Sequence, residues 1–241
     1  MRTVILSLAV GLLANLSIAQ TKIQKNFSVE KGQELTLKFD YPQIVKITTW
    51  KQNEVSISGN VNINNGKNDS NFKLTESKNS QGKTIEGKVV KLEDIPHQVT
   101  ATFGNEKKQF QTKEDYQKYI DANDIKSSSV STGVQMDITL EIKVPEHMKT
   151  TIESTYGTIE VINFDAPIIA QSTYGSVDAT MNAKQIGEIK VETFFGKMYT
   201  NLDFGIKTIK SDNFHSVIAA NVGKQPLQEF SSKYGNVYLR K

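Results

Sequence analysis

The chain has 241 residues, of which 23% are charged, and its formal net charge is +3 at pH 7. Lysine supplies nearly all of the positive charge and is spread along the chain, whereas nucleic-acid binding calls for a clustered basic patch, so we expect no nucleic-acid partner. Cysteine is absent, which excludes disulfides, thiolate catalysis and cysteine-ligated metal.

Residues 1–19 predict a signal peptide. Arg2 gives a positive start, residues 4–14 are almost wholly apolar, and residues 17–19 include the small side chains that signal peptidase requires for cleavage before Gln20. The apolar stretch is shorter than the roughly 20 residues of a membrane-spanning helix, and no second one follows. We therefore expect an exported protein, in the periplasm or on the outer cell surface, without a transmembrane segment after cleavage.

Residues 20–90 alternate apolar and polar side chains over several short stretches, which predicts half-buried strands. The segment from Asn62 to Asp69 interrupts this pattern with asparagines and Gly66, which are typical of a tight turn. The same segment resembles an oxygen-ligand calcium loop, but it contains a single carboxylate, and we favour a plain turn.

Residues 91–128 break the alternation and predict an insertion with a hairpin and one short helix. Thr112 and Asp115 have the spacing of a capping box, which places the start of the helix. The insertion can either fill an end of the β body or carry a binding site. In the second case the binding residues we expect are the aromatic residues Phe110, Tyr116 and Tyr119.

Residues 129–241 begin with a long alternating strand and continue with a repeat. Each unit has an aromatic residue followed at once by a small or polar residue, at spacings of 18, 21, 19 and 20 residues. Such a period predicts a stack of β coils in which each coil buries its face against the next. The five pairs are Tyr156-Gly157, Tyr174-Gly175, Phe195-Gly196, Phe214-His215 and Tyr234-Gly235.

The alternation also predicts where the aromatic residues point. Ile152 lies four residues before Tyr156, so we expect both to face the interior of the coil. The glycine that follows is expected to form a corner with positive φ, and equivalent rings are expected to stack as a ladder. The alternative is that the rings face outward and form a platform for sugar rings or extended chains.

The fourth unit departs from this pattern. Lys210 stands four residues before Phe214, where the other units are apolar, and His215 replaces the glycine. Because Ile209 lies one residue earlier, a one-residue bulge would restore the alternation. We favour a tolerated irregularity, with a functional site as the alternative.

These patterns together predict an all-β fold. Residues 20–241 are expected to form one domain, a single-stranded parallel β-solenoid with coils of about 20 residues and the small insertion.

The sequence resembles a family of secreted β-strand-repeat proteins of unknown function in Bacteroidetes, which often carry the adhesin label. The resemblance rests on LEIKVPEHMKTTIESTYGTIEV, QSTYGSVDA, VETFFGKMYTNLDF and SSKYGNVYLRK, and on VKITTWKQNEVSISGNVNINNG nearer the N-terminus. It covers most of the mature chain and implies a right-handed solenoid exported from a Gram-negative cell. It carries no catalytic residues to this chain.

No catalytic, cofactor or metal motif is evident. Hydrolysis of a polysaccharide needs paired carboxylates, whereas the carboxylates of the repeats mix with lysines and predict a solvated face. The three histidines have no metal-ligand spacing. The carboxylates are Glu153, Glu160, Asp178, Glu192 and Asp212, and the histidines are His97, His147 and His215.

We therefore expect a non-enzymatic exported protein with a structural or adhesin-like role and no cofactor. Its partner would be a cell-envelope component or an extracellular polymer or protein. A carbohydrate-binding module that uses stacked aromatic residues is the alternative, and an enzyme acting on polysaccharide is the third possibility.

Overall fold

The computed structural model describes residues 20–80, 82–146, 148–182, 187–203, 205–221 and 223–241. The predicted signal peptide, residues 1–19, and His147 lie outside these ranges. Strands dominate the described chain, so the fold is all-β, as the alternation predicts. None of the helices among these residues is long and apolar enough to cross a membrane.

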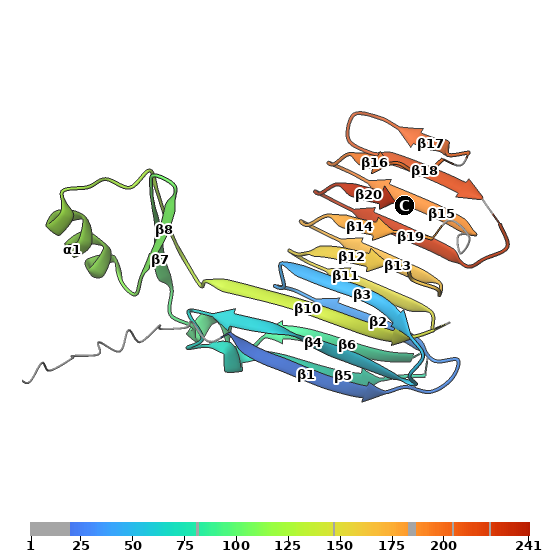
Figure 1. Cartoon of the computed structure of the whole chain (residues 1–241), viewed down its shortest axis with the longest axis horizontal. Helices are drawn as coiled ribbons and strands as arrows, with labels where there is room; N and C mark the ends of the chain where they lie inside the picture. The colour runs from blue at the N-terminus through green and yellow to red at the C-terminus, as the bar shows by residue number, and fades with distance from the viewer. Residues whose placement is uncertain (1–19, 81, 147, 183–186, 204, 222) are drawn as a thin grey trace, which may run out of the picture.

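Two large sheets form the body of the molecule (Figure 1). The first sheet has eight strands, in the spatial order β1 (Thr21–Ser28), β4 (Glu54–Ile63), β10 (Met136–Pro145), β3 (Ile44–Trp50), β12 (Thr158–Ile162), β14 (Val177–Thr180), β20 (Val237–Arg240) and β16 (Met198–Thr200). The second sheet has nine strands, in the order β17 (Lys207–Ser211), β18 (Ser216–Asn221), β15 (Glu188–Thr193), β19 (Leu227–Ser232), β13 (Ile168–Ser172), β11 (Thr150–Ser154), β2 (Glu34–Phe39), β6 (Gly82–Val89) and β5 (Phe72–Lys78).

The middle of each sheet is parallel and is built from coils. A coil contributes one strand to the second sheet, turns a corner, and contributes the next strand to the first sheet. The coils are, in spatial order, β2–β3, β11–β12, β13–β14, β19–β20 and β15–β16, and neighbouring coils pair in parallel in both sheets.

Three of the four ends of the described sheets are antiparallel, whereas β16 at the end of the first sheet pairs in parallel with β20. Strands β1, β4 and β10 pair in this way at one end of the first sheet, as do β5 and β6 in the second. At the other end of the second sheet, β15, β18 and β17 are antiparallel. The sheets are therefore mixed, and the structure does not show the single parallel solenoid that the repeat predicts. Alternation predicts strands but not their direction, so the antiparallel pairs among residues 20–90 could not be told from coils.

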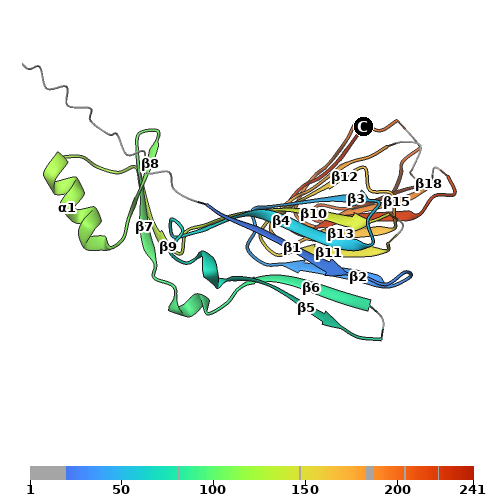
Figure 2. The same ribbon diagram turned by 60° about the horizontal axis from the view of Figure 1, so that its bottom comes forward.

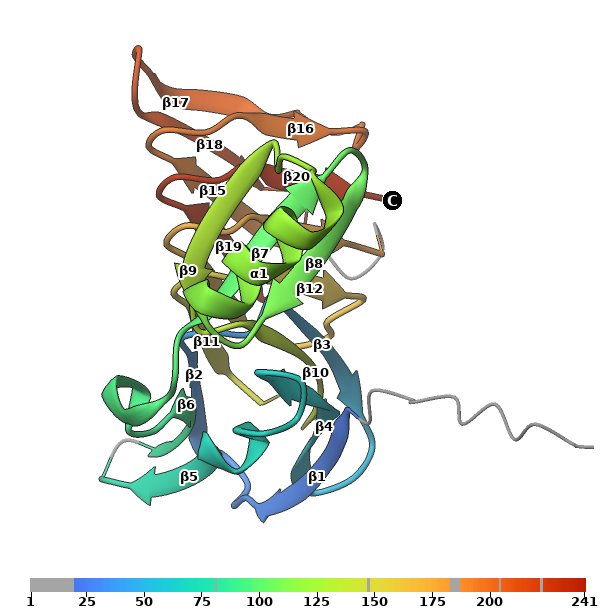
Figure 3. The same ribbon diagram turned by 90° about the vertical axis from the view of Figure 1, so that its left-hand side faces the viewer.

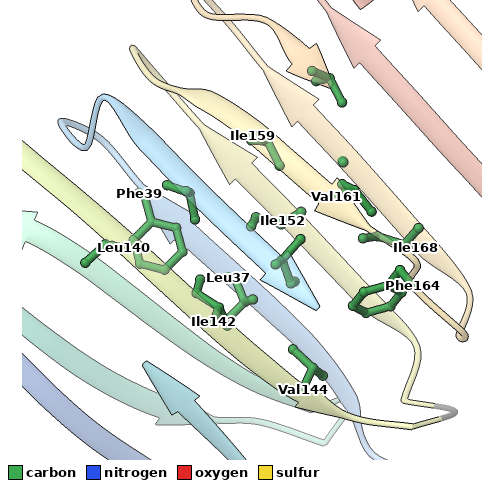
Figure 4. Close-up of a cluster of buried hydrophobic side chains, with 14 of the residues drawn as sticks. Leu37, Phe39, Leu140, Ile142, Val144, Ile152, Ile159, Val161, Phe164 and Ile168 are labelled. Carbon is green, nitrogen blue, oxygen red and sulfur yellow. The ribbon is translucent and has the colours of Figure 1, made fainter. Parts of the chain in front are cut away.

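The core lies between the two sheets, which face each other in Figure 3. Leu37 and Ile152 from the second sheet and Ile142 and Ile159 from the first are buried there (Figure 4). The parallel register places Ile152 of β11 beside Leu37 of β2, so equivalent apolar side chains form continuous rows. Burial of these rows is the main contribution to stability in a chain without disulfides.

The insertion forms a third sheet, β8 (Glu106–Phe110), β7 (Gln98–Phe103) and β9 (Ser129–Gly133), with helix α1 (Lys113–Asn123). It projects from the body beyond β10 (Figures 1 and 2). The Thr112 hydroxyl accepts a hydrogen bond of 3.0 Å from the Asp115 backbone N–H, which is the predicted helix cap. The insertion reaches Gly133 rather than residue 128, because the exposed strand β9 has too few apolar residues to be recognised from the sequence.

Candidate functional site: a ladder of exposed aromatic rings

Aromatic side chains from successive corners of the coils stack into one row, called here the aromatic ladder. Its members, in spatial order, are Tyr41, Tyr156, Tyr174, Tyr234, Phe195 and Phe214. From Tyr41 to Phe195 the ring centroids are 5.1–5.6 Å apart and neighbouring planes differ by 8–18°. The last pair, Phe195 and Phe214, is more tilted, with centroids 5.8 Å apart and planes 47° apart.

The repeat aromatics face solvent, which corrects the predicted inward orientation. Tyr156, Tyr174, Phe195, Phe214 and Tyr234 are each 44–65% exposed. The alternation fails because it shifts by one residue at the corner: Ser154 and Gly157 are both buried, and the two residues between them form the bend. Counting along a straight strand cannot detect this shift, so the outward alternative is the one that the structure supports.

The repeat glycines also have a different role from the predicted one. Gly157, Gly175, Gly196 and Gly235 do not have positive φ. Instead, their backbones lie against the next coil: a Cβ atom on Gly175 would be 2.2 Å from the carbonyl oxygen of Gly157, and one on Gly235 would be 2.2 Å from that of Gly175. Glycine is required because only a hydrogen atom fits between adjacent corners.

Buried hydroxyl groups bind these corners together. The Ser172 hydroxyl accepts a hydrogen bond of 3.0 Å from the Gly175 N–H and donates one of 3.0 Å to the Gly157 carbonyl. Ser232 does the same with Gly235 and Gly175, at 2.8 and 2.7 Å. Sequence reasoning missed these residues, although a hydroxyl residue stands two positions before the aromatic residue in STYG, STYG, TFFG and SKYG.

The geometry decides which part of each ring a ligand can reach. Stacking covers the faces of the inner rings, so the exposed parts of Tyr156, Tyr174 and Tyr234 are ring edges and hydroxyl groups. None of these three hydroxyls hydrogen bonds with a group in the described part of the chain. The ladder is therefore not a flat stacking platform; it presents a row of free donors and acceptors between apolar ring edges.

The first ring of the ladder differs in its surroundings. Tyr41 is half-buried and stacks on Tyr156. Burial, followed by the nearby Tyr156 and Asp40, raises the pKa of the Tyr41 hydroxyl above its ordinary value. This hydroxyl therefore remains protonated and able to donate a hydrogen bond.

The other end of the ladder is apolar and is built by the fourth repeat unit. This unit is not a coil but the hairpin β17–β18, and its register shifts between Thr208 and Lys210, which is the predicted bulge. The His215 ring stacks on Phe194 with centroids 4.3 Å apart, and its Nε2 atom lies 2.6 Å from a carboxylate oxygen of Glu192. The hairpin thus fixes two further rings beside the end of the ladder.

Asp212 closes the turn of this hairpin. Its carboxylate accepts hydrogen bonds from the backbone N–H groups of Phe214, at 3.1 Å, and His215, at 2.7 Å. These two bonds, and then Lys210 nearby, hold the pKa of Asp212 below its ordinary value. Asp212 therefore accepts hydrogen bonds from the N–H groups of its own turn, as Ser172 and Ser232 do at their corners, but it does not donate to a neighbouring coil as they do.

The three aromatic residues of the insertion do not form an exposed surface. Phe110 is buried, and Tyr116 and Tyr119 pack on it with ring centroids 5.5 and 5.3 Å away. With Val99 and Ala101 they form the separate small core of the insertion. The structure thus places them where they hold the helix against β7 and β8.

The candidate carboxylates of the repeats lie on outer faces. Glu160 and Asp178 are neighbours in the parallel register of β12 and β14, and no other two of them are register partners among the described strands. Within the described residues, four of them contact a lysine or arginine: Glu153 with Lys38, Asp178 with Arg240, Glu192 with Lys190 and Asp212 with Lys210.

Glu160 lines a groove of about 760 Å³ on the outer face of the first sheet. Glu141 is in the same groove, but Lys46 on β3 lies between the two in the strand register. The carboxylate beside Glu160 in the register is Asp178, which pairs with Arg240 at 2.7 Å.

The loop from Asn62 to Asp69 is a tight turn. The Asp69 carboxylate accepts a hydrogen bond of 2.6 Å from the Ile63 N–H, and Gly66 and two asparagines have positive φ. His97 and His215 lie in different parts of the fold. Among the residues that the structure describes, no group of three acidic, histidine or cysteine side chains could hold a metal ion.

No protein-family model and no curated protein matches the sequence. Two solved structures are similar to the chain, each with 8% identity. A candidate cell adhesion protein from Clostridium sporogenes has a TM-score of 0.49 over 92% of this chain and 99% of its own. A candidate adhesin from Bacteroides fragilis has a TM-score of 0.23 over 92% of this chain and 98% of its own.

Proposed function

We propose that this chain is an exported, adhesin-like binding protein without catalytic activity, and that it binds an extended glycan along the aromatic ladder. The proposal for export rests on the apolar and positively charged pattern of residues 1–19. The proposal for binding rests on the ladder, and above all on its row of exposed tyrosine hydroxyls, which have no hydrogen-bond partner among the residues that the structure describes.

The spacing of the ladder favours a glycan over a peptide. Rings Tyr156, Tyr174 and Tyr234 repeat every 5.1–5.3 Å. An extended peptide places side chains on one face every ~6.6 Å, which is two residues of about 3.3 Å each. Its successive side chains therefore cannot all lie opposite successive rings of the ladder. An equatorially linked pyranose unit advances a glycan chain by about the spacing of these rings. Successive sugars can therefore meet successive hydroxyls.

The rigidity of the ladder supports the same role. Each ring is held by stacking on both sides, and each corner is fixed by hydrogen bonds such as those of Ser172 and Ser232. Little side-chain freedom remains to be lost when a ligand binds. Rigid aromatic contact surfaces of this kind bind with a low entropic cost.

The variant Tyr174→Phe tests this proposal, because it removes a hydroxyl and keeps the stacked ring. The protein from residue 20 onward is applied to a glycan array, and affinity for the glycan that it binds is then measured for wild type and variant. Loss of one hydrogen bond, worth about 0.5–1.5 kcal/mol, should weaken binding about two- to tenfold, with the free energy of unfolding nearly unchanged.

Tyr199→Phe is the matched control. Tyr199 is 47% exposed and stacks on Tyr238 with centroids 5.1 Å apart, but it lies outside the ladder. Its loss of a hydroxyl should leave the affinity unchanged. Equal weakening by both variants, or no saturable binding of the wild type to any glycan, would contradict the proposal.

A further inference from the structure

The order of the coils in space differs from their order in the chain. The coil formed by β19 and β20, residues 227–240 and called here the inserted coil, lies between the coils β13–β14 and β15–β16, which precede it in sequence. Strand β19 pairs in parallel with β13 on one side and with β15 on the other. Strand β20 pairs in the same way with β14 and β16.

The inserted coil connects two parts of the molecule. Among the described strands, the unit β15–β18 has no strand pairing with the rest of the body except through β19 and β20. In a stack of coils, stability comes from the interfaces between neighbours. The inserted coil therefore supplies both interfaces that attach this unit to the body.

The contacts of the inserted coil are specific on both sides. Tyr234 stacks between Tyr174 and Phe195, with centroids 5.1 and 5.2 Å away. On one side, Ser232 donates a hydrogen bond to the Gly175 carbonyl and Arg240 pairs with Asp178 at 2.7 Å. On the other side, the Gly235 carbonyl accepts a hydrogen bond of 3.1 Å from the Thr193 hydroxyl.

A short connection leads into this coil. Strand β18 ends at Asn221, β19 begins at Leu227, and these two strands lie on opposite sides of β15. The crossing passes close to the start of β15, where a Cβ atom on Gly187 would lie 1.7 Å from the Gln225 carbonyl oxygen. A short, tightly placed connection of this kind favours the exchange of an element between copies, since an extended connection relieves the crossing.

We propose that two copies of this chain assemble by exchanging their inserted coils. The occupant of the site between β13–β14 and β15–β16 is then residues 227–240 of a second copy, which make every contact described above. The exchanged pair would carry two ladders and would bind a polymer at two places, which raises its overall affinity.

Disulfide trapping tests this exchange in the full chain, which has no cysteine of its own. Gln171 on β13 and Ser231 on β19 are partners in the parallel register. Strands about 4.8 Å apart bring the two Cα atoms within disulfide range. Gln171→Cys is placed in one copy and Ser231→Cys in another; the two are mixed in denaturant, refolded together and oxidised.

Exchange predicts a disulfide-linked dimer of the two variants, with a yield that rises with protein concentration during refolding. Glu153→Cys mixed with Ser231→Cys is the mismatched control, because Glu153 pairs with Gln171 and lies two strands from Ser231. A distance of roughly 9.6 Å across two strands is too long for a disulfide. The matched pair should therefore give a several-fold higher yield than the mismatched pair.

Equal yields from the two pairs would overturn the proposal, because random collisions would then explain the dimers. A double variant with Gln171→Cys and Ser231→Cys in one chain checks the register by forming the bond within the monomer. Light scattering on the wild-type protein gives an independent outcome: refolding only to monomers at every concentration would also overturn the exchange. Either result leaves glycan binding by the monomer untouched.

Discussion

At the scale of single residues, the repeat is determined by how closely two backbones approach. The corners stack so tightly that glycine is needed after Tyr156, Tyr174, Phe195 and Tyr234, and buried hydroxyls such as those of Ser172 and Ser232 join one corner to the next. The aromatic ring points away from this crowded interior. The four residues of a corner, such as those from Ser172 to Gly175, therefore both connect the coils and present the ring to solvent.

The substitution Gly175→Val should destabilise the protein by about 3 kcal/mol, because the new side chain overlaps the Gly157 carbonyl and forces the coils apart. Gly133→Val is the control: no atom lies within 4 Å of a Cβ at Gly133, and it is in strand β9. Urea denaturation of the two variants measures the difference. Similar free energies of unfolding for both would contradict the close approach.

Residue patterns predicted part of this site. The position of each aromatic-glycine pair was evident from the spacing, and so was the ladder as an arrangement. The direction of the rings was not, because the alternation shifts at a corner and residues such as Ser154 and Gly157 are both buried. Tyr41 was missed, because it is followed by Pro42 and not by glycine, so it lacks the pattern of the repeat.

At the scale of elements, the hairpin β17–β18 ends the second sheet and fixes the apolar end of the ladder. Its turn depends on Asp212, which accepts two backbone hydrogen bonds. Because the pKa of Asp212 is lowered in the folded protein, its ionised form stabilises the hairpin above the ordinary pKa, and this stabilisation is lost as the pH falls through the folded-state pKa.

Asp212→Asn tests this role. Wild type should have a higher thermal midpoint than the variant at neutral pH, where Asp212 is ionised, and the difference should disappear in acid, where Asp212 is protonated. Thermal unfolding is measured for both proteins over this pH range. A difference that persists unchanged into acid would show that the charge of Asp212 does not stabilise the turn.

At the scale of the whole molecule, the sequence predicted which elements form better than it predicted the spatial order of the coils. The all-β fold, the short helix after Thr112 and the bulge near Ile209 follow from local patterns. The place of β19 and β20 between earlier coils does not, since all the coils share one pattern and any of them can pack on any other. The order of the coils is determined only by the paths of the connections, and the alternation of apolar and polar residues does not predict those paths.

This order determines the surface that the molecule presents. Because the inserted coil places Tyr234 beside Tyr174, the ladder has four tyrosines in succession followed by two phenylalanines. In chain order, the tyrosines would be interrupted by Phe195. The continuous row of hydroxyls is thus a property of the assembled molecule.

Tyrosine footprinting by mass spectrometry tests the exposed ladder as a glycan site most directly. A reagent that modifies accessible phenols should label Tyr156, Tyr174 and Tyr234 in the free protein, as it labels Tyr199, since all four are exposed. Addition of the bound glycan should protect the three ladder tyrosines and leave Tyr199 reactive. Ladder tyrosines that resist labelling in the free protein, or equal protection of Tyr199 by the glycan, would contradict the account.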